Sequence, residues 1–282
     1  MRQGAAPLAL AGLPLAFLLV VLVAPAVRLV AEGWPTDGHS LQALWAPWQD
    51  DYLRWRMAWS FLQALLTCAA ALVLGLPLAW VLARLEFRGR SLVLRALMLP
   101  FVVPTLVAAL GVLALMGPHG VLVQLGGPDL QGTAWLLLYG NLFFNLCVVV
   151  RAGTDALEQV SASRLAAART LGASPWRAFW RVEWPAIAPW LMSALCLVFL
   201  YCFAGFGLAL VLGGQRYATV EVEIYTLVAH ELQLGQAAVL ALWMLMLTAL
   251  VAWGYAAIER QLATPGRADR QPQEVFPVES TL

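Results

Sequence analysis

The stretch LAAARTLGASPWR, residues 165–177, and the VEWP that follows it at residues 182–185 lie between two long apolar segments. Small helix-forming residues come first, and Gly172 then interrupts them. Glycine readily adopts the left-handed backbone that ends one helix and redirects the chain. Ser174 and Pro175 suit the cap and the first position of a second helix. The stretch therefore predicts two short helices, joined by a sharp turn, between two membrane spans.

The composition around this stretch is that of a membrane protein. Hydrophobic residues make up 62% of the 282 positions and charged residues 12%, whereas a soluble domain has about 45–50% and about 25%. Apolar stretches of about 20 residues can cross the hydrocarbon core as helices, which satisfy their own backbone hydrogen bonds in lipid. We expect an all-α integral membrane protein with six transmembrane helices, at about residues 7–27, 57–83, 91–116, 133–151, 187–211 and 236–258.

The basic residues predict the orientation of these spans. Every one of them is an arginine, because the sequence contains no lysine. If the N-terminus is cytoplasmic, 13 of the 17 arginines lie on the cytoplasmic side, and the other four are Arg28, Arg54, Arg56 and Arg216. Cytoplasmic loops of membrane proteins carry an excess of basic residues. We therefore expect both termini to be cytoplasmic.

The predicted spans form one domain, followed by a tail. The six-helix domain covers residues 1–258 and includes a cytoplasmic loop at about residues 155–185. Residues 259–282 form a cytoplasmic tail that is polar and contains proline, which is typical of disordered segments. The loop motif occurs once and no internal duplication is visible, so we expect one six-helix unit.

Two pairs of residues inside the spans are candidates for a translocation path. Pro100 and Pro104, in the third span, each remove a backbone hydrogen bond and predict a kink or an unwound turn, which in many transporters lines the substrate route. Asn141 and Asn145 are one helical turn apart and share a face, so both amides should point toward other helices or a wet cavity. The alternatives are plain helix kinks and hydrogen bonds between helices.

The sequence excludes several kinds of chemistry. A phosphate-binding loop of the form GxxxxGK[ST] needs a lysine, so we expect no ATPase site and no enzymatic activity in this chain. The four cysteines have no metal-binding spacing, no motif implies a cofactor, and a net charge of +1 does not support nucleic-acid binding. The spans lack the central acidic residues that an ion-coupled secondary transporter uses. Energy should therefore enter through the loops, from another polypeptide.

The basic aromatic part of the 165–177 stretch is a candidate docking surface. Trp176 and Arg177 are residue types that dominate the energetics of protein interfaces. Ala167, Ala168 and Ala173 carry little bulk, so a partner can approach the backbone closely. An amphipathic helix bound only to anionic lipid is the alternative interpretation.

The order of these residues resembles the EAA loop of permeases in binding-protein-dependent ABC importers. That loop reads EAA, three residues, Gly, nine residues, Ile, one residue and Leu-Pro. Ala166 takes the place of the loop's glutamate, and Trp184 takes the place of its leucine. The positions that fit the pattern are Ala167, Ala168, Gly172, Val182 and Pro185.

The resemblance implies a type I ABC importer permease in the bacterial inner membrane, passing through the lipid bilayer several times. Its partners would be cytoplasmic ATP-binding subunits, a second permease half in the same or another chain, and a periplasmic substrate-binding protein. The ATP-binding subunits would dock against Ala167, Ala168, Gly172, Ala173, Trp176, Arg177 and Pro185.

Within that family, the likeness is greatest to permeases for thiamine or thiamine pyrophosphate. It is carried by FFN at residues 143–145, EWP at residues 183–185 and YCFA at residues 201–204. Those permeases usually have two six-helix halves in one polypeptide, and this chain resembles the first half. Permeases for ferric iron or another small anion share the architecture and are the alternative.

Overall fold

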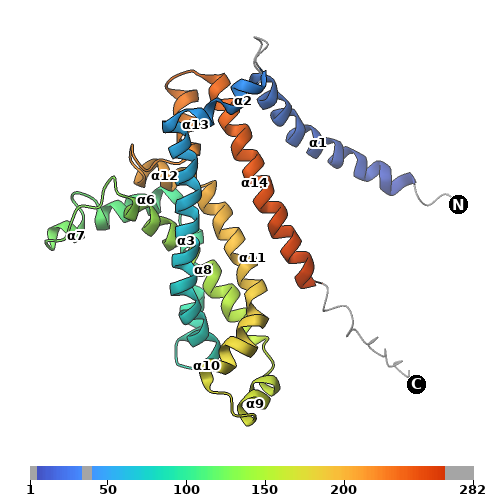
Figure 1. The fold of residues 1–282 in the computed structure, drawn as a ribbon, viewed down its shortest axis with the longest axis vertical. Coiled ribbons are helices and arrows are strands. Elements are labelled where there is room, and N and C mark those ends of the chain that lie inside the picture. The colour runs from blue at the N-terminus through green and yellow to red at the C-terminus, as the bar shows by residue number, and fades with distance from the viewer. Residues whose placement is uncertain (1–4, 34–39, 264–282) are drawn as a thin grey trace, which may run out of the picture.

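A computed structural model of the chain describes residues 5–33 and 40–263. Regular structure in this part of the chain is helical (Figure 1). The helices are α1 (Ala5–Gly33), α2 (Ser40–Gln49), α3 (Asp51–Arg84), α4 (Arg90–Ala96), α5 (Leu99–Val102), α6 (Thr105–Met116), α7 (Val121–Gln124), α8 (Ala134–Glu158), α9 (Ala162–Thr170), α10 (Pro175–Ala178), the π-helical turn η1 (Phe179–Glu183), α11 (Trp184–Phe203), α12 (Phe206–Leu212), α13 (Val220–Ala229) and α14 (Leu234–Ala263).

Six helical segments of the described residues are long and apolar enough to cross a membrane, which confirms the predicted all-α fold and the number of spans. These segments are Pro14–Glu32, Asp51–Arg84, Thr105–Gln124, Ala134–Glu158, Pro175–Phe203 and Leu234–Arg260.

Two of the predicted spans are interrupted. The third, predicted at residues 91–116, is divided into α4, α5 and α6, and Pro104 adopts the extended-type ψ of 136° just before α6. The fifth, predicted at residues 187–211, ends as α11 at Phe203, and α12 begins after Gly205. A Cβ at Gly205 would lie 2.8 Å from the carbonyl oxygen of Tyr201, so glycine is required for this close approach.

The sixth predicted span, residues 236–258, is longer in the structure. Helix α14 continues through Ala263, because Glu259, Arg260 and the residues after them are good helix formers that extend the helix beyond its apolar part. The remainder of the predicted tail, residues 264–282, lies outside the described residues.

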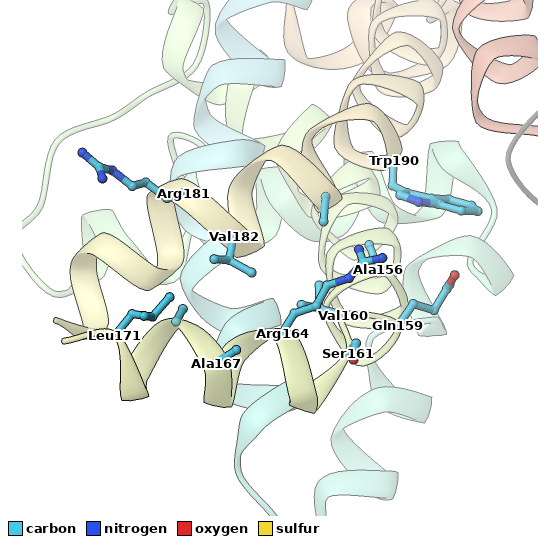
Figure 2. Close-up of a pocket in the computed structure, with 12 residues that line it drawn as sticks. Ala156, Gln159, Val160, Ser161, Arg164, Ala167, Leu171, Arg181, Val182 and Trp190 are labelled. Carbon is cyan, nitrogen blue, oxygen red and sulfur yellow. The ribbon is translucent and has the colours of Figure 1, made fainter. Parts of the chain in front are cut away.

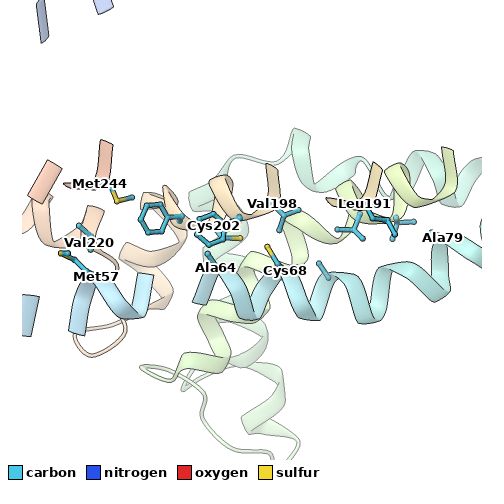
Figure 3. Packing of buried hydrophobic residues seen from close by; sticks show 14 of the residues in the cluster. Met57, Ala64, Cys68, Ala79, Leu191, Val198, Cys202, Val220 and Met244 are labelled. Atoms are coloured by element: carbon cyan, nitrogen blue, oxygen red, sulfur yellow. The ribbon is translucent and has the colours of Figure 1, made fainter. Parts of the chain in front are cut away.

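Helix α3 is the central helix, and it packs along α8 and α11. A line of small buried residues on α3, which includes Ala64, Cys68 and Ala79, faces residues of α11 such as Val198 (Figure 3). A Cβ at Gly75 of α3 would lie 3.0 Å from Val149 Cγ1 of α8. Small residues allow helices to pack this closely in membranes.

The bundle has two distinct ends. Figure 1 shows α9 and α10 at one end, here called the α9 end, and α2 and α13 at the other, here called the α13 end. Helix α1 contacts α14 and then extends away from the bundle (Figure 1).

Candidate functional site

The sharp turn predicted at Gly172 is present at the α9 end, and with it both predicted helix boundaries are confirmed. Gly172 has a φ of +82°, and its N–H donates to the carbonyl of Arg169 at 3.0 Å. The N–H of Ala173 donates to the carbonyl of Ala168 at 3.0 Å, which completes a Schellman motif. Ser174 Oγ then accepts from the N–H of Arg177 and caps α10.

No loop separates α10 from the fifth span. The π-helical turn η1 begins directly after α10, and α11 begins directly after η1. Single π-helical turns are rare and are frequent at functional sites. Because the helical path is continuous, a displacement of α10 is carried into α11.

The predicted docking residues fall on two sides of the segment that runs from α9 to the start of α11. Ala167 and Ala168 line a groove of about 730 Å³ between α9 and the start of α11. Figure 2 shows Arg164 pointing from α9 toward Ala156 and Trp190 in this groove. Ala168 is half-buried, whereas Ala167 lines the groove and is exposed.

The other predicted docking residues, apart from Ala173, which is half-buried, are exposed. Trp176 is 69% exposed, and Arg177 and Pro185 are also exposed. At Gly172 no atom of the described residues lies within 4 Å of where a Cβ would be. This side is open to a partner.

Two ion pairs hold the α9 end together, and the sequence analysis missed both. Arg84, at the end of α3, pairs with Glu183 of η1. Arg90 pairs with Glu158 at the end of α8. Glu183 is the single carboxylate between Gly172 and the end of α11 at Phe203, and this isolation was the one signal in the sequence for its ion pair.

A third ion pair, Arg56 with Glu223, lies at the α13 end and was also missed. Arg56 Nε is 3.4 Å from Glu223 Oε2, and both side chains are less than 10% exposed. The two Nη atoms of Arg56 donate to the carbonyls of Gln215, Arg216 and Ala218. The loop between α12 and α13 is thereby attached to α3.

A cavity of about 320 Å³ lies beside the break between α11 and α12. It is lined by Thr105, Asn141, Phe144, Asn145, Tyr201, Ala204, Gly205, Phe206, Gly207 and Leu208. None of these described residues carries a charge, and three of them are aromatic. Such a surface suits an aromatic ring or an organic cation better than an inorganic anion.

The asparagines predicted for the path line this cavity and also join helices. Asn141 and Asn145 are each 4% exposed. Asn141 Nδ2 donates to Gln63 Oε1 of α3 at 2.7 Å, and Asn145 Nδ2 donates to Cys202 Sγ of α11 at 3.3 Å. A place on a translocation path and a role in hydrogen bonding between helices are therefore compatible for these two asparagines.

The prolines predicted for the path interrupt the third span but do not line the cavity. Pro100 is half-buried in α5, and Pro104 is exposed. Thr105, which follows Pro104, lines the cavity, so the break determines where α6 begins beside it. Within the described residues no group of three His, Cys, Asp or Glu side chains could hold a metal ion.

A bundle with six candidate spans, a cavity at a helix break and a helical element protruding at one end has the architecture of a membrane transport subunit. Two solved structures share this fold. One is a bacterial alginate ABC transporter in complex with an alginate pentasaccharide-bound periplasmic protein, with a TM-score of 0.73, 16% identity, and coverage of 91% of this chain and 95% of the other. The other is the MetNI methionine ABC transporter in an inward-facing conformation, with a TM-score of 0.57, 13% identity, and coverage of 76% and 99%.

Sequence comparison gives relatives that are more similar. The thiamine transport system permease protein ThiP of Escherichia coli (strain K12) is 35% identical over 79% of this chain and 42% of its own length. ThiP of Brucella abortus (strain 2308) is 33% identical over 85% of this chain and 45% of its own length. The molybdenum transport system permease protein ModB of Azotobacter vinelandii is 35% identical over 57% of this chain and 75% of its own length. The chain spans less than half the length of these ThiP relatives.

The family model described as "Binding-protein-dependent transport system inner membrane component" matches residues 71–264. The chain belongs to this family, and the resemblance inferred from residues 166–185 is confirmed. It is a multi-pass membrane component of a transport system.

Proposed function

We propose that this chain is a permease subunit of an ATP-driven importer, and that thiamine or one of its phosphates is the substrate. The α9 end faces the cytoplasm, together with both termini, as the distribution of arginines predicts. The protein lies in the bacterial inner membrane. A periplasmic binding protein delivers the substrate at the α13 end, and a second permease half completes the path.

Separate ATP-binding subunits supply the energy at the α9 end. They dock on the exposed side of the element formed by α9, Gly172 and α10, where Trp176 offers a large rigid anchor. Closure of these subunits displaces α10, and the continuous helical path through η1 carries the displacement into α11. The cavity beside the α11–α12 break then changes its accessibility.

The observation that favours thiamine is the chemistry of that cavity. Phe144, Tyr201 and Phe206 supply aromatic faces, and no charged side chain is among the described residues that line it. The thiazolium and aminopyrimidine rings of thiamine can stack on such faces, and the positive charge is attracted by them. The thiamine permeases among the relatives are consistent with this assignment.

A small anion such as molybdate, or ferric iron, is the second candidate, because the molybdenum permease ModB is also similar to the chain. The neutral cavity does not favour it. Oxyanions in proteins are usually held by arginine, lysine or converging N–H groups, and ferric iron by several anionic ligands, whereas the residues that line this cavity include no carboxylate and a single phenol, Tyr201.

Uptake by the assembled transporter tests the proposal. The chain is co-purified with its second permease half and its ATP-binding subunits and reconstituted into liposomes with the binding protein. We expect ATP-dependent accumulation of labelled thiamine that excess molybdate or ferric citrate does not reduce. Accumulation of molybdate but not thiamine would refute the substrate assignment, and uptake without ATP would refute the ABC mechanism.

A further inference from the structure

The amide of Gln63 has only one possible orientation. Gln63 is fully buried on α3, and its Nε2 donates to the backbone carbonyl of Ser60 at 3.0 Å and to that of Cys202 at 2.7 Å. A carbonyl oxygen only accepts hydrogen bonds, so both contacts require the nitrogen of the amide. The oxygen, Oε1, is therefore left to face Asn141 on α8.

The orientation of the Gln63 amide determines how the asparagines that line the cavity are oriented. Because Gln63 presents an acceptor, Asn141 must turn its nitrogen toward Gln63, and Nδ2 donates to Oε1 at 2.7 Å. Asn145 Nδ2 donates to the backbone carbonyl of Asn141 at 2.8 Å and to Cys202 Sγ at 3.3 Å, so both of its N–H groups are used. The side-chain oxygen is then the remaining polar atom of Asn145.

The oxygens of both asparagines are open to the cavity. Neither Asn141 Oδ1 nor Asn145 Oδ1 accepts a hydrogen bond from the residues that the structure describes. In that same part of the chain, the unpaired side-chain atoms that are sealed from solvent are Trp48 Nε1, Arg56 Nε, Arg84 Nε and Thr219 Oγ1. The two oxygens are not among these atoms, and both residues line the cavity.

We infer that Gln63 determines the selectivity of this cavity as a positioning residue that does not itself line it. It holds Asn141 so that an amide oxygen faces the cavity, and Asn145 adds a second oxygen. The cavity therefore takes an aromatic ring that carries an amino group, which can donate to these oxygens. A ligand with a carbonyl or oxyanion at that place brings oxygen against oxygen. The inference rests on the proposed function, because it takes the cavity as part of the substrate path.

Two substitutions of Gln63 separate orientation from packing. Gln63→Met keeps the volume but removes the acceptor, so Asn141 can turn its nitrogen to the cavity. Gln63→Glu keeps an acceptor for Asn141 in either protonation state, and when protonated it can also donate to the Cys202 carbonyl. Orientation is therefore lost in the first variant and kept in the second.

The probe pair is thiamine and oxythiamine, in which a carbonyl oxygen replaces the amino group. Initial uptake of each is measured in liposomes that contain the full chain with the same second permease half, ATP-binding subunits and binding protein. Because the partner proteins are the same in every assay, a change in the ratio of thiamine uptake to oxythiamine uptake between variants is caused by this chain. We expect wild type to favour thiamine by about tenfold, the effect of one well-made hydrogen bond. The ratio should fall toward one in Gln63→Met and stay near the wild-type value in Gln63→Glu.

Thr154→Val is the matched control. Thr154 is a buried polar residue on α8 that donates to the backbone carbonyl of Val150 and to neither asparagine, so the ratio should stay unchanged. Should Gln63→Met fail to insert, Asn141→Ala carries the same prediction, because it removes the oriented amide itself.

Thiamine uptake with equal ratios in wild type and Gln63→Met, or in wild type and Asn141→Ala, would overturn the inference and leave the proposed function intact. An equal fall of the ratio in Gln63→Met and Gln63→Glu would also overturn it, because orientation would not be the cause. No thiamine uptake by a wild-type complex that hydrolyses ATP would overturn the proposed substrate and, with it, this inference.

Discussion

Arg84, the last residue of α3, is ion-paired with Glu183 of η1, and the pair joins the central helix to the turn that follows α10. The side chain of Glu183 is 5% exposed and that of Arg84 is 23% exposed. Arg90 connects α3 to α8, because it pairs with Glu158 of α8 and its Nε donates to the carbonyl of Leu82 of α3 at 2.6 Å. A displacement of α10 is therefore transmitted to α3 and α8 as well as to α11.

Removing one partner of the Arg84–Glu183 pair should weaken both the fold and the coupling. Glu183→Gln leaves the Arg84 guanidinium without its counter-charge, and breaking a buried pair in this way costs about 3–5 kcal/mol. We expect the lower end of this range, because Arg84 is partly exposed. ATP turnover should persist while uptake falls. Melting followed by tryptophan fluorescence in nanodiscs, together with paired ATPase and uptake assays, measures the two effects.

The double variant Arg84→Met/Glu183→Met provides the control for that prediction. With both charges removed, neither is left buried alone, so the stability loss should be smaller than the sum of the losses measured in the single variants Arg84→Met and Glu183→Met. Strict additivity would show that the two side chains do not interact.

A bulky residue at Gly172 should uncouple ATP hydrolysis from uptake. Gly172 has a left-handed backbone, and an added Cβ has no atom of the described chain within 4 Å apart from the adjacent residues, so there is room for a new side chain. Any non-glycine residue costs about 1–2 kcal/mol in this conformation. We therefore expect Gly172→Ala and Gly172→Trp to lower the melting temperature equally. Gly172→Trp alone should lower the number of substrate molecules transported per ATP, because the ring collides with the docked partner.

Gly89 is a matched control at the same end of the molecule. It also has a left-handed backbone, with a φ of +97°, and open space around it, but it lies outside the element formed by α9 and α10. Gly89→Trp should therefore lower stability to the same extent and leave coupling unchanged. Equal uncoupling by both tryptophan variants would contradict a specific docking role for Gly172.

The structural features that could be predicted depend on residues that are close to one another in the sequence. The six spans follow from local hydropathy, and the left-handed turn at Gly172 follows from turn chemistry within a few positions. The break of the third span follows from Pro100 and Pro104. In each case the physical cause lies within about one or two helical turns of its effect.

The features that were missed depend on contacts between distant residues. Arg84 and Glu183 are 99 positions apart, and Gln63 and Cys202 are 139 positions apart. No local pattern indicates which of the 17 arginines meets which carboxylate. The face shared by Asn141 and Asn145 was predictable from helical periodicity. The orientation of their amides was not, because Gln63 on another helix determines it.

The stability of the chain should depend on pH through Glu221. This residue lies in the first turn of α13, outside the candidate spans, and burial raises the pKa of its carboxyl above the ordinary value of 4.5. The folded state then holds a proton that the unfolded state has released, so this contribution to stability falls as pH rises from 4.5 through the raised pKa. Glu221→Gln removes the effect. The variant should melt at a higher temperature than wild type near neutral pH, and the difference should vanish in acid.

Glu223→Gln, two positions away, should have the opposite effect near neutral pH, since the carboxylate of Glu223 pairs with Arg56 and accepts from Tyr52 Oη at 2.8 Å. Melting curves of the two variants and wild type across the pH range distinguish the effects. A Glu221→Gln variant that is less stable than wild type near neutral pH would contradict the role assigned to burial.

Arg56 should control the order of the loop between α12 and α13. Its Nη1 donates to the carbonyls of Arg216 and Ala218 at 3.2 Å each, and its Nη2 donates to that of Gln215 at 2.6 Å. Arg56→Met leaves these carbonyls without a donor and leaves the buried Glu223 without its counter-charge, a loss of about 3–5 kcal/mol. Arg56→Lys keeps the charge but loses the planar fork that reaches several carbonyls together, so its effect should be intermediate.

Trypsin provides a local measurement of this effect, because Arg216 is exposed in the loop that Arg56 holds. Cleavage after Arg216, followed by mass spectrometry in nanodiscs, should be faster in Arg56→Met than in wild type. Arg54→Met is the control, since Arg54 is an exposed neighbour that pairs with Asp51 on its own helix, and its loss should change stability by no more than about 0.5 kcal/mol. Unchanged cleavage in Arg56→Met despite a lower melting temperature would show that Arg56 stabilises the bundle without holding this loop, and that the loop owes its order to Trp59 of α3, whose Nε1 donates to the carbonyl of Tyr217 at 2.7 Å.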